Sequence, residues 1–133
     1  MNIDIRRTKP DELRAASDAF RTALLFPPSS DDDWANPPLV ASFVDFISVS
    51  AWDDALCVGH AGAFPFVTAV PGGARLATAG VSRIGVRQTH TRRGVLTTAM
   101  HQLLREAADA GMVLASLRAS EAVIYQRFGF AVA

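Results

Sequence analysis

The sequence predicts a single α+β (or α/β) domain, and three observations support this class. The chain has 133 residues, about the length of one domain. Half of the residues are hydrophobic, which is enough to build a core. Segments with strand-like alternation and segments with helical spacing follow one another in the order β-α-α-β-β-β-α-β-α-β.

The first half of the chain is predicted to form a strand (2–8), a helix (9–25), a loop (26–38) and a second helix (39–52). Ile3 and Ile5 alternate with polar residues, as in a half-buried strand. Pro10 suits the first turn of the first helix, and Pro, Ser and Asp dominate the loop. Four apolar residues at spacings of three and four predict the second helix: Leu39, Phe43, Phe46 and Ile47.

The second half is predicted to form strands within 55–86, a helix (95–110), a strand (112–119), a short helix (120–128) and a last strand (128–133). The segment Pro71–Gly73 predicts a tight turn between two strands. The long helix has one apolar face and ends before Gly111. Ser120 is suited to cap the short helix, and Phe128 and Phe130 are expected in the core.

Composition excludes several classes of protein. Thirteen basic and thirteen acidic residues give no net charge, so nothing favours nucleic acid or a membrane surface as a partner. No segment resembles a signal peptide or a membrane span, which predicts a cytoplasmic protein. Cys57 is the only cysteine and is expected to be a buried apolar residue, although a Cys–His nucleophilic pair stays open. The histidines have no metal-ligand spacing, so no metal is expected.

The junction between a strand and a helix at "VRQTHTRRGVLTTAM" is the most informative motif. Arg92, Arg93 and Gly94 come directly before the helix. A helix N-terminus presents unpaired N–H groups and a partial positive charge, and glycine lets a ligand approach the backbone. Arginine adds donors suited to phosphate. The junction therefore predicts a pyrophosphate site, with a helix start carrying solvated arginines as the alternative.

The same motif carries a family resemblance. The segments "VSRIGV", "RQTHTRRG" and "VLTTAMHQLL" resemble the acetyl-coenzyme A signature of the GNAT (Gcn5-related) N-acetyltransferases. With "LASLRASEAVIYQRFGFAVA", residues 68–133 resemble the N-terminal acetyltransferase domain of the enhanced intracellular survival (Eis) family, whose members acetylate amines, including aminoglycosides. The resemblance implies a mixed, mostly antiparallel sheet flanked by helices, and acetyl-CoA as cosubstrate.

The resemblance also implies a coenzyme site. The strand that ends at Val86 splays from its neighbour, and its backbone at Ile84, Gly85 and Val86 pairs with the pantetheine arm. The pyrophosphate is bound by N–H groups of the junction, and Ser120 matches a family position near the coenzyme, although an N-cap role explains Ser120 equally well. The junction residues in this role are Arg92, Arg93, Gly94, Val95 and Leu96.

Tyr125 is the only tyrosine and, by resemblance, the general acid that protonates the thiolate of coenzyme A. The alternative is a core tyrosine whose hydroxyl bonds to the backbone. The acceptor is expected to be a primary amine: an aminoglycoside-like or polyamine-like molecule, or a lysine side chain. A cationic amine suits an acidic pocket with an aromatic wall, which points to Asp33 and Trp34 in the acidic loop, with a solvated loop as the alternative.

The chain ends where the resemblance predicts further strands. We therefore expect residues 1–133 to be an N-terminal GNAT domain that is incomplete at its C-terminus, with the last strands absent. An open sheet edge favours a homo-oligomer or completion by another segment. Besides an active N-acetyltransferase, the sequence leaves open a non-catalytic CoA-binding or oligomerising remnant and a plain structural domain.

Overall fold

A computed structural model of the chain describes residues 2–44, 47–119 and 123–132. Five strands, five α-helices and two short 3-10 turns make up this part of the chain. In order they are β1 (Ile3–Arg7), η1 (Pro10–Glu12), α1 (Leu13–Ala23), α2 (Asp31–Trp34), α3 (Pro37–Val44), β2 (Ile47–Asp53), β3 (Leu56–Ala69), β4 (Arg75–Val86), η2 (Gln88–His90), α4 (Val95–Asp109), β5 (Leu114–Ser116) and α5 (Val123–Gln126). Among the described residues, no helix combines the length and apolar character needed to cross a bilayer.

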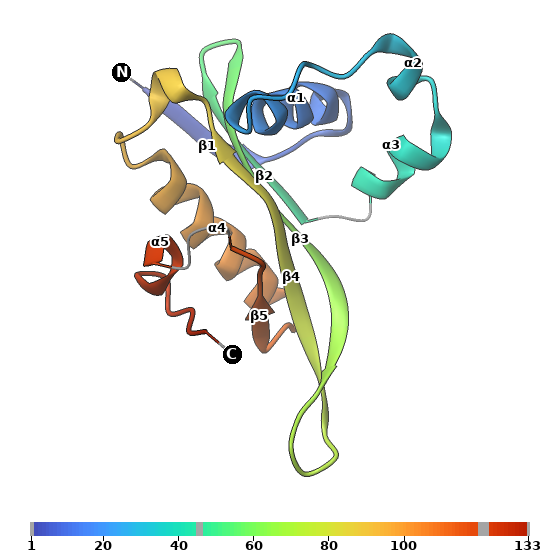
Figure 1. The fold of residues 1–133 in the computed structure, drawn as a ribbon, viewed down its shortest axis with the longest axis vertical. Coiled ribbons are helices and arrows are strands. Elements are labelled where there is room, and N and C mark those ends of the chain that lie inside the picture. Colours follow the sequence, from blue (N-terminus) through green and yellow to red (C-terminus); the bar gives the residue numbers. More distant parts are fainter. Residues whose placement is uncertain (1, 45–46, 120–122, 133) are drawn as a thin grey trace.

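The strands form one mixed sheet in the order β1-β2-β3-β4-β5. The first four strands are antiparallel, and β5 pairs with β4 in parallel. The helices α1 and α4 lie on opposite faces of this sheet (Figure 1). The predicted class, an α+β domain with a mostly antiparallel sheet flanked by helices, is therefore confirmed.

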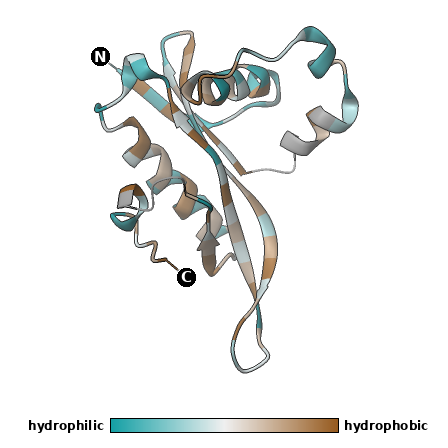
Figure 2. Cartoon of the chain, in the orientation of Figure 1, coloured by the Kyte–Doolittle hydropathy of each residue, from teal (hydrophilic) through white to brown (hydrophobic). Residues whose placement is uncertain are grey.

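The core lies mainly between α4 and the sheet. The buried face of α4 packs on small and branched side chains of the strands, and apolar residues gather along α4, β3 and β4 (Figure 2). On the other face, α1 packs on Trp52 and Cys57. Burying both faces of the central strands in this way holds β3 and β4 in place under the site. The α4 cluster comprises Ile47, Val49, Ala61, Ala63, Ala79, Val81, Ala99, Met100, Leu103 and Ala107.

The prediction of one helix over 39–52 is wrong in its second half. Helix α3 ends at Val44, and Ile47–Asp53 form β2, which pairs with β1 and β3. Ser48 and Ser50 alternate with apolar residues, and the serine hydroxyls are buried in hydrogen bonds, so the strand is buried on both faces. Such a strand has no polar face that would reveal its period in the sequence. Phe46, which supported the helix, lies outside the described residues.

Two smaller differences concern the predicted loop and the last strand. The acidic part of the loop forms α2, which Ser30 caps by accepting a hydrogen bond from the N–H of Asp33 over 3.1 Å. At the other end of the chain, the described residues 127–132 form no strand. Instead, Phe128 and Phe130 pack against the α4 cluster, which confirms their expected place in the core.

Candidate functional site

Strands β4 and β5 separate part of the way along β4. Their pairing runs from Thr78 and Leu114 to Gly80 and Ser116, whereas β4 continues to Val86. The described part of β5 therefore leaves one backbone edge of 81–86 uncovered (Figure 1). An extended ligand can add to such an edge as a further strand, using main-chain hydrogen bonds. This is the slot predicted from the sequence.

A β-bulge follows the last residue of β4 that pairs with β5. The register advances by two residues in β3, from His60 to Gly62, and by three in β4, from Gly85 back to Ser82. Arg83 lies within the bulge with a φ of +55°, which is uncommon for a residue with a side chain. A bulge bends its strand and increases the local twist. The bend directs the rest of β4 away from β5.

The first turn of α4 lies at the wide end of this slot. Arg92 and Gly94 have φ values of +61° and +74°, which bring the chain tightly around into the helix. Backbone turns of this kind arrange N–H groups into a concave anion site, and the first N–H groups of α4 have no partner within the helix. The local geometry is therefore suited to a phosphate group.

A cavity of about 520 Å³ joins the slot to the start of α4. Seven of the predicted coenzyme residues line it: Ile84, Gly85, Val86, Arg92, Gly94, Val95 and Leu96. The other lining residues are His90, Thr91, Thr97, Ile124, Tyr125 and Arg127. Arg93 is exposed and is not one of the lining residues. Ser120 lies outside the described residues, so its predicted place is not tested. The cavity brings residues from β4, α4 and α5 into one site.

Hydrogen bonds from outside the motif hold the loop between β4 and α4. His90 is 8% exposed, and its Nε2 donates to the Asp53 carboxylate over 2.8 Å. Its Nδ1 lies 2.7 Å from the hydroxyl oxygen of Thr89. Nearby, Arg87 donates from Nε to the Cys57 carbonyl oxygen over 2.7 Å. Asp53 was not singled out from the sequence as a functional residue, because most of the strand that carries it was predicted as helix.

Cys57 is buried, as predicted, and burial raises the pKa of its thiol to about 11. It is therefore a thiol and not a thiolate at neutral pH, which removes the nucleophile that a Cys–His pair would need.

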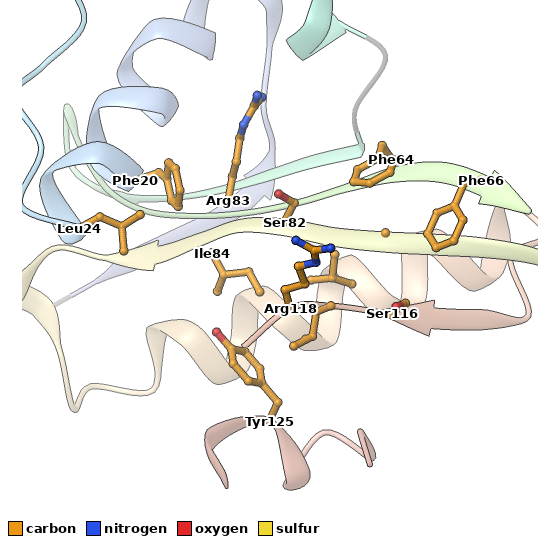
Figure 3. Close-up of a pocket in the computed structure, with 13 residues that line it drawn as sticks. Phe20, Leu24, Phe64, Phe66, Ser82, Arg83, Ile84, Ser116, Arg118 and Tyr125 are labelled. Atoms are coloured by element: carbon orange, nitrogen blue, oxygen red, sulfur yellow. The ribbon is translucent and has the colours of Figure 1, made fainter. Parts of the chain in front are cut away.

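Tyr125 lies where two cavities meet. It lines the coenzyme-side cavity and also a second cavity of about 560 Å³. Ile84 is shared in the same way. The hydroxyl end of Tyr125 points toward β4 (Figure 3). Its ring contacts Phe130 edge-on, with 6.4 Å between the ring centroids. Partial burial raises the pKa of the phenol, so the proton stays on the hydroxyl at neutral pH.

The second cavity has an aromatic wall and two arginines. Phe20 and Leu24 reach it from the end of α1, and Phe64 and Phe66 from β3 (Figure 3). Arg83 and Arg118 provide its charge. These residues differ from the acidic loop and Trp34, for which the sequence predicted contact with the substrate.

Asp33 and Trp34 line neither cavity. The Asp33 carboxylate accepts a hydrogen bond from the N–H of Ser30 over 3.1 Å, and this bond lowers the pKa of the carboxyl group. In this structure Asp33 therefore serves the N-terminus of α2. Contact of either residue with a substrate stays a prediction.

Comparison with known families agrees with this geometry. The profile described as "Acetyltransferase (GNAT) domain" matches residues 4–133. The chain belongs to the GNAT acetyltransferases. The resemblance seen in the sequence is confirmed, and with it the assignment of this chain to an enzyme family.

Two curated relatives are N-acetyltransferases by name. An uncharacterised N-acetyltransferase from Streptomyces avermitilis is 48% identical over 85 residues, which are 64% of this chain and 21% of the relative. The N-acetyltransferase Eis of Mycobacterium bovis is 40% identical over 123 residues, with 76% of this chain and 31% of the relative covered. The chain thus spans a fifth to a third of the length of these relatives.

A solved structure shows the same arrangement. The crystal structure of Eis1 from Mycobacterium abscessus has a TM-score of 0.80 and 36% identity, covering 99% of this GNAT domain and 32% of the Eis1 chain. The splayed strands and the helix start described above therefore belong to a fold that this domain shares with an Eis protein.

Proposed function

We propose that this GNAT domain transfers an acetyl group from acetyl-CoA to a primary amine on a small molecule. The observation that supports the proposal best is the shared cavity. It joins the uncovered backbone of Ile84–Val86, the first turn of α4 and the Tyr125 side chain. A coenzyme with its pyrophosphate at Arg92–Leu96 and its pantetheine arm along β4 places the thioester near Tyr125.

The residues present match the needs of the chemistry. The neutral amine attacks the thioester carbonyl, a C–N bond forms, and the carbonyl oxygen becomes an oxyanion. As this intermediate collapses, the C–S bond breaks and the phenolic proton of Tyr125 passes to the coenzyme A thiolate. The amine nitrogen loses a proton to solvent, and solvent returns a proton to the Tyr125 phenolate. A phenol and a thiol of similar basicity exchange a proton at little cost.

The second cavity is our proposed acceptor site. It meets the coenzyme-side cavity at Tyr125 and Ile84, so an amine held there lies next to the proposed position of the thioester. Association into a homo-oligomer, or completion of the site by other segments, is a further proposal, because the relatives are much longer chains.

The first test is calorimetric titration of acetyl-CoA into the 133-residue chain. We expect micromolar binding, weakened at least tenfold in an Arg92→Ala/Arg93→Ala variant because two cationic donors near the phosphate are lost. An Arg75→Ala/Arg105→Ala variant is the matched control, because it removes the same charge from residues that do not line the cavity. A folded chain that binds no acetyl-CoA would contradict the proposal.

Turnover separates the enzyme from a non-catalytic coenzyme-binding remnant. Release of free coenzyme A thiol in the presence of an amine, lost in the double arginine variant, supports an enzyme. Tight coenzyme binding without release of thiol toward any amine supports the remnant.

A further inference from the structure

We propose that the acceptor is an amine that also carries a carboxylate and an apolar or aromatic group, and that Arg118 is the main residue that recognises the carboxylate. This inference deepens the proposed function and rests on it, because it takes the second cavity as the acceptor site. It differs from the expectation of an aminoglycoside or a polyamine, both of which carry several positive charges.

The charge of the cavity is the first argument. Arg83 and Arg118 line it, and none of the described lining residues is Asp or Glu. A polycation in this space would place an ammonium group near the Arg118 guanidinium, with no carboxylate from the described lining to compensate the two charges. Like charges at such range disfavour binding, whereas an anion is attracted.

Arg118 is the better placed of the two arginines. It follows β5 and extends toward β4 across the space between the strands (Figure 3). It forms no ion pair among the described residues, whereas other arginines of the chain do. Its planar guanidinium can donate two parallel hydrogen bonds to a carboxylate. Arg83 also lines the cavity from β4, and partial burial lowers the pKa of its guanidinium.

The walls of the cavity specify the rest of the acceptor. Phe64 and Phe66 are 40% and 38% exposed, and their ring centroids lie 5.8 Å apart. These two rings form an apolar surface that a single hydrophobic side chain would cover, and Phe20 and Leu24 line the other end of the cavity (Figure 3). A molecule with an amine near Tyr125, a carboxylate at Arg118 and an aromatic ring on this wall satisfies all three features.

Two ligands that differ only in the carboxylate test this proposal: N-acetyl-L-phenylalanine and N-acetyl-L-phenylalaninamide. Both lack the free amine, so differences in amine basicity do not enter, and binding requires no turnover. Calorimetric titration into the chain, with and without saturating coenzyme A, is expected to show at least tenfold tighter binding of the acid. Equal binding, tighter binding of the amide or of N-acetylspermidine, or no binding of the acid at millimolar concentration would overturn the proposal.

Variants assign the effect to one residue. Arg118→Gln is expected to weaken the acid about tenfold and to leave the amide unchanged. Arg105→Gln removes the same charge from an exposed position of α4 outside the cavity and is the matched control. If Arg118→Gln instead weakens coenzyme A and leaves the acid unchanged, Arg118 belongs to the coenzyme site and the proposal fails.

The experiments distinguish failure of the proposed function from failure of the proposed carboxylate recognition. A chain that binds acetyl-CoA but does not prefer the acid leaves the proposed function intact and contradicts only the proposed recognition of a carboxylate. A chain that prefers the acid through Arg118 but binds no acetyl-CoA contradicts the proposed function while keeping an anion site at the second cavity.

Discussion

The imidazole of His60 on β3 lies with Nδ1 2.6 Å from the backbone carbonyl oxygen of Arg83, in the bulge of β4. Because a carbonyl oxygen only accepts, Nδ1 carries the proton and donates it. The other nitrogen, Nε2, lies 2.9 Å from the Ser48 hydroxyl oxygen. A neutral, buried histidine thus ties the centre of the sheet to the bulge that bends β4 toward both cavities.

Replacing His60 should affect both stability and activity. His60→Ala leaves the Arg83 carbonyl and the Ser48 hydroxyl without this partner and opens a cavity, which together cost about 2–4 kcal/mol. Urea unfolding measures the loss. We expect the catalytic efficiency to fall as well, because the bulge loses its support, and His60→Gln to recover part of both because its amide can still donate to the carbonyl. Equal behaviour of the Ala and Gln variants would speak against a role for the hydrogen bond.

The same histidine predicts how stability depends on pH. Burial lowers the pKa of His60 from 6.5 to about 4 in the folded chain. Between these values the unfolded chain binds more protons, so stability is fully present above pH 6.5 and falls as the pH drops toward 4, by up to about 3 kcal/mol. Urea unfolding at several pH values should show this slope in the wild type. His60→Gln has no group that titrates there, so an unchanged slope in this variant would assign the effect to other residues.

Tyr125→Phe tests the proposed general acid. The ring stays and keeps its contact with Phe130, so coenzyme binding should not change. Loss of the proton donor is expected to lower kcat about 10²- to 10⁴-fold. Because burial raises the pKa of Tyr125 above the ordinary value of about 10, deprotonation of the phenol should lower the wild-type activity only at a pH above that value. Steady-state kinetics at several pH values measure kcat of the variant and the pH dependence of the wild type. An unchanged kcat in the variant would remove Tyr125 from the mechanism.

The junction before α4 could be singled out from the sequence because its signal is local, and its role as the coenzyme site stays a prediction. Arg92, Gly94 and Leu96 lie within one helix turn of each other, and the fold has only to place β4 before them. The bond between His60 and Arg83 and the bond between Asp53 and His90 join residues 23 and 37 positions apart. These contacts depend on the register of the strands, which in turn depends on β2. Most of β2 was predicted as helix because of the spacing of its apolar residues. Arg118 was overlooked for a similar reason, since only the separation of β4 and β5 gives it a cavity to line.

Asp53→Asn tests the support of the coenzyme loop. The change replaces a charged acceptor of the His90 hydrogen bond by a neutral one, a difference of about 1 kcal/mol. We expect KM for acetyl-CoA to rise about three- to tenfold with little change in kcat, because the loop is less firmly held and the reacting atoms are untouched. Asp54→Asn makes the same substitution at the exposed neighbouring residue and should have no effect. A drop in kcat without a rise in KM would assign Asp53 another role.

Gly94→Ala distinguishes two roles of this glycine: adopting a left-handed backbone at the start of α4, and leaving room for a ligand in front of that backbone. Gly94 has a φ of +74°, and an added Cβ would meet no atom of the chain within 4 Å. The left-handed conformation alone then costs about 1–2 kcal/mol in stability. If the coenzyme pyrophosphate lies against this backbone, the methyl group also occupies its place, and affinity for acetyl-CoA should fall at least tenfold. Gly111→Ala is the matched control, because Gly111 has a φ of +90°, is equally open and lies at the other end of α4. Thermal unfolding should show similar losses for both variants, whereas calorimetry should show weaker coenzyme binding for Gly94→Ala alone; equal affinities would place the pyrophosphate elsewhere.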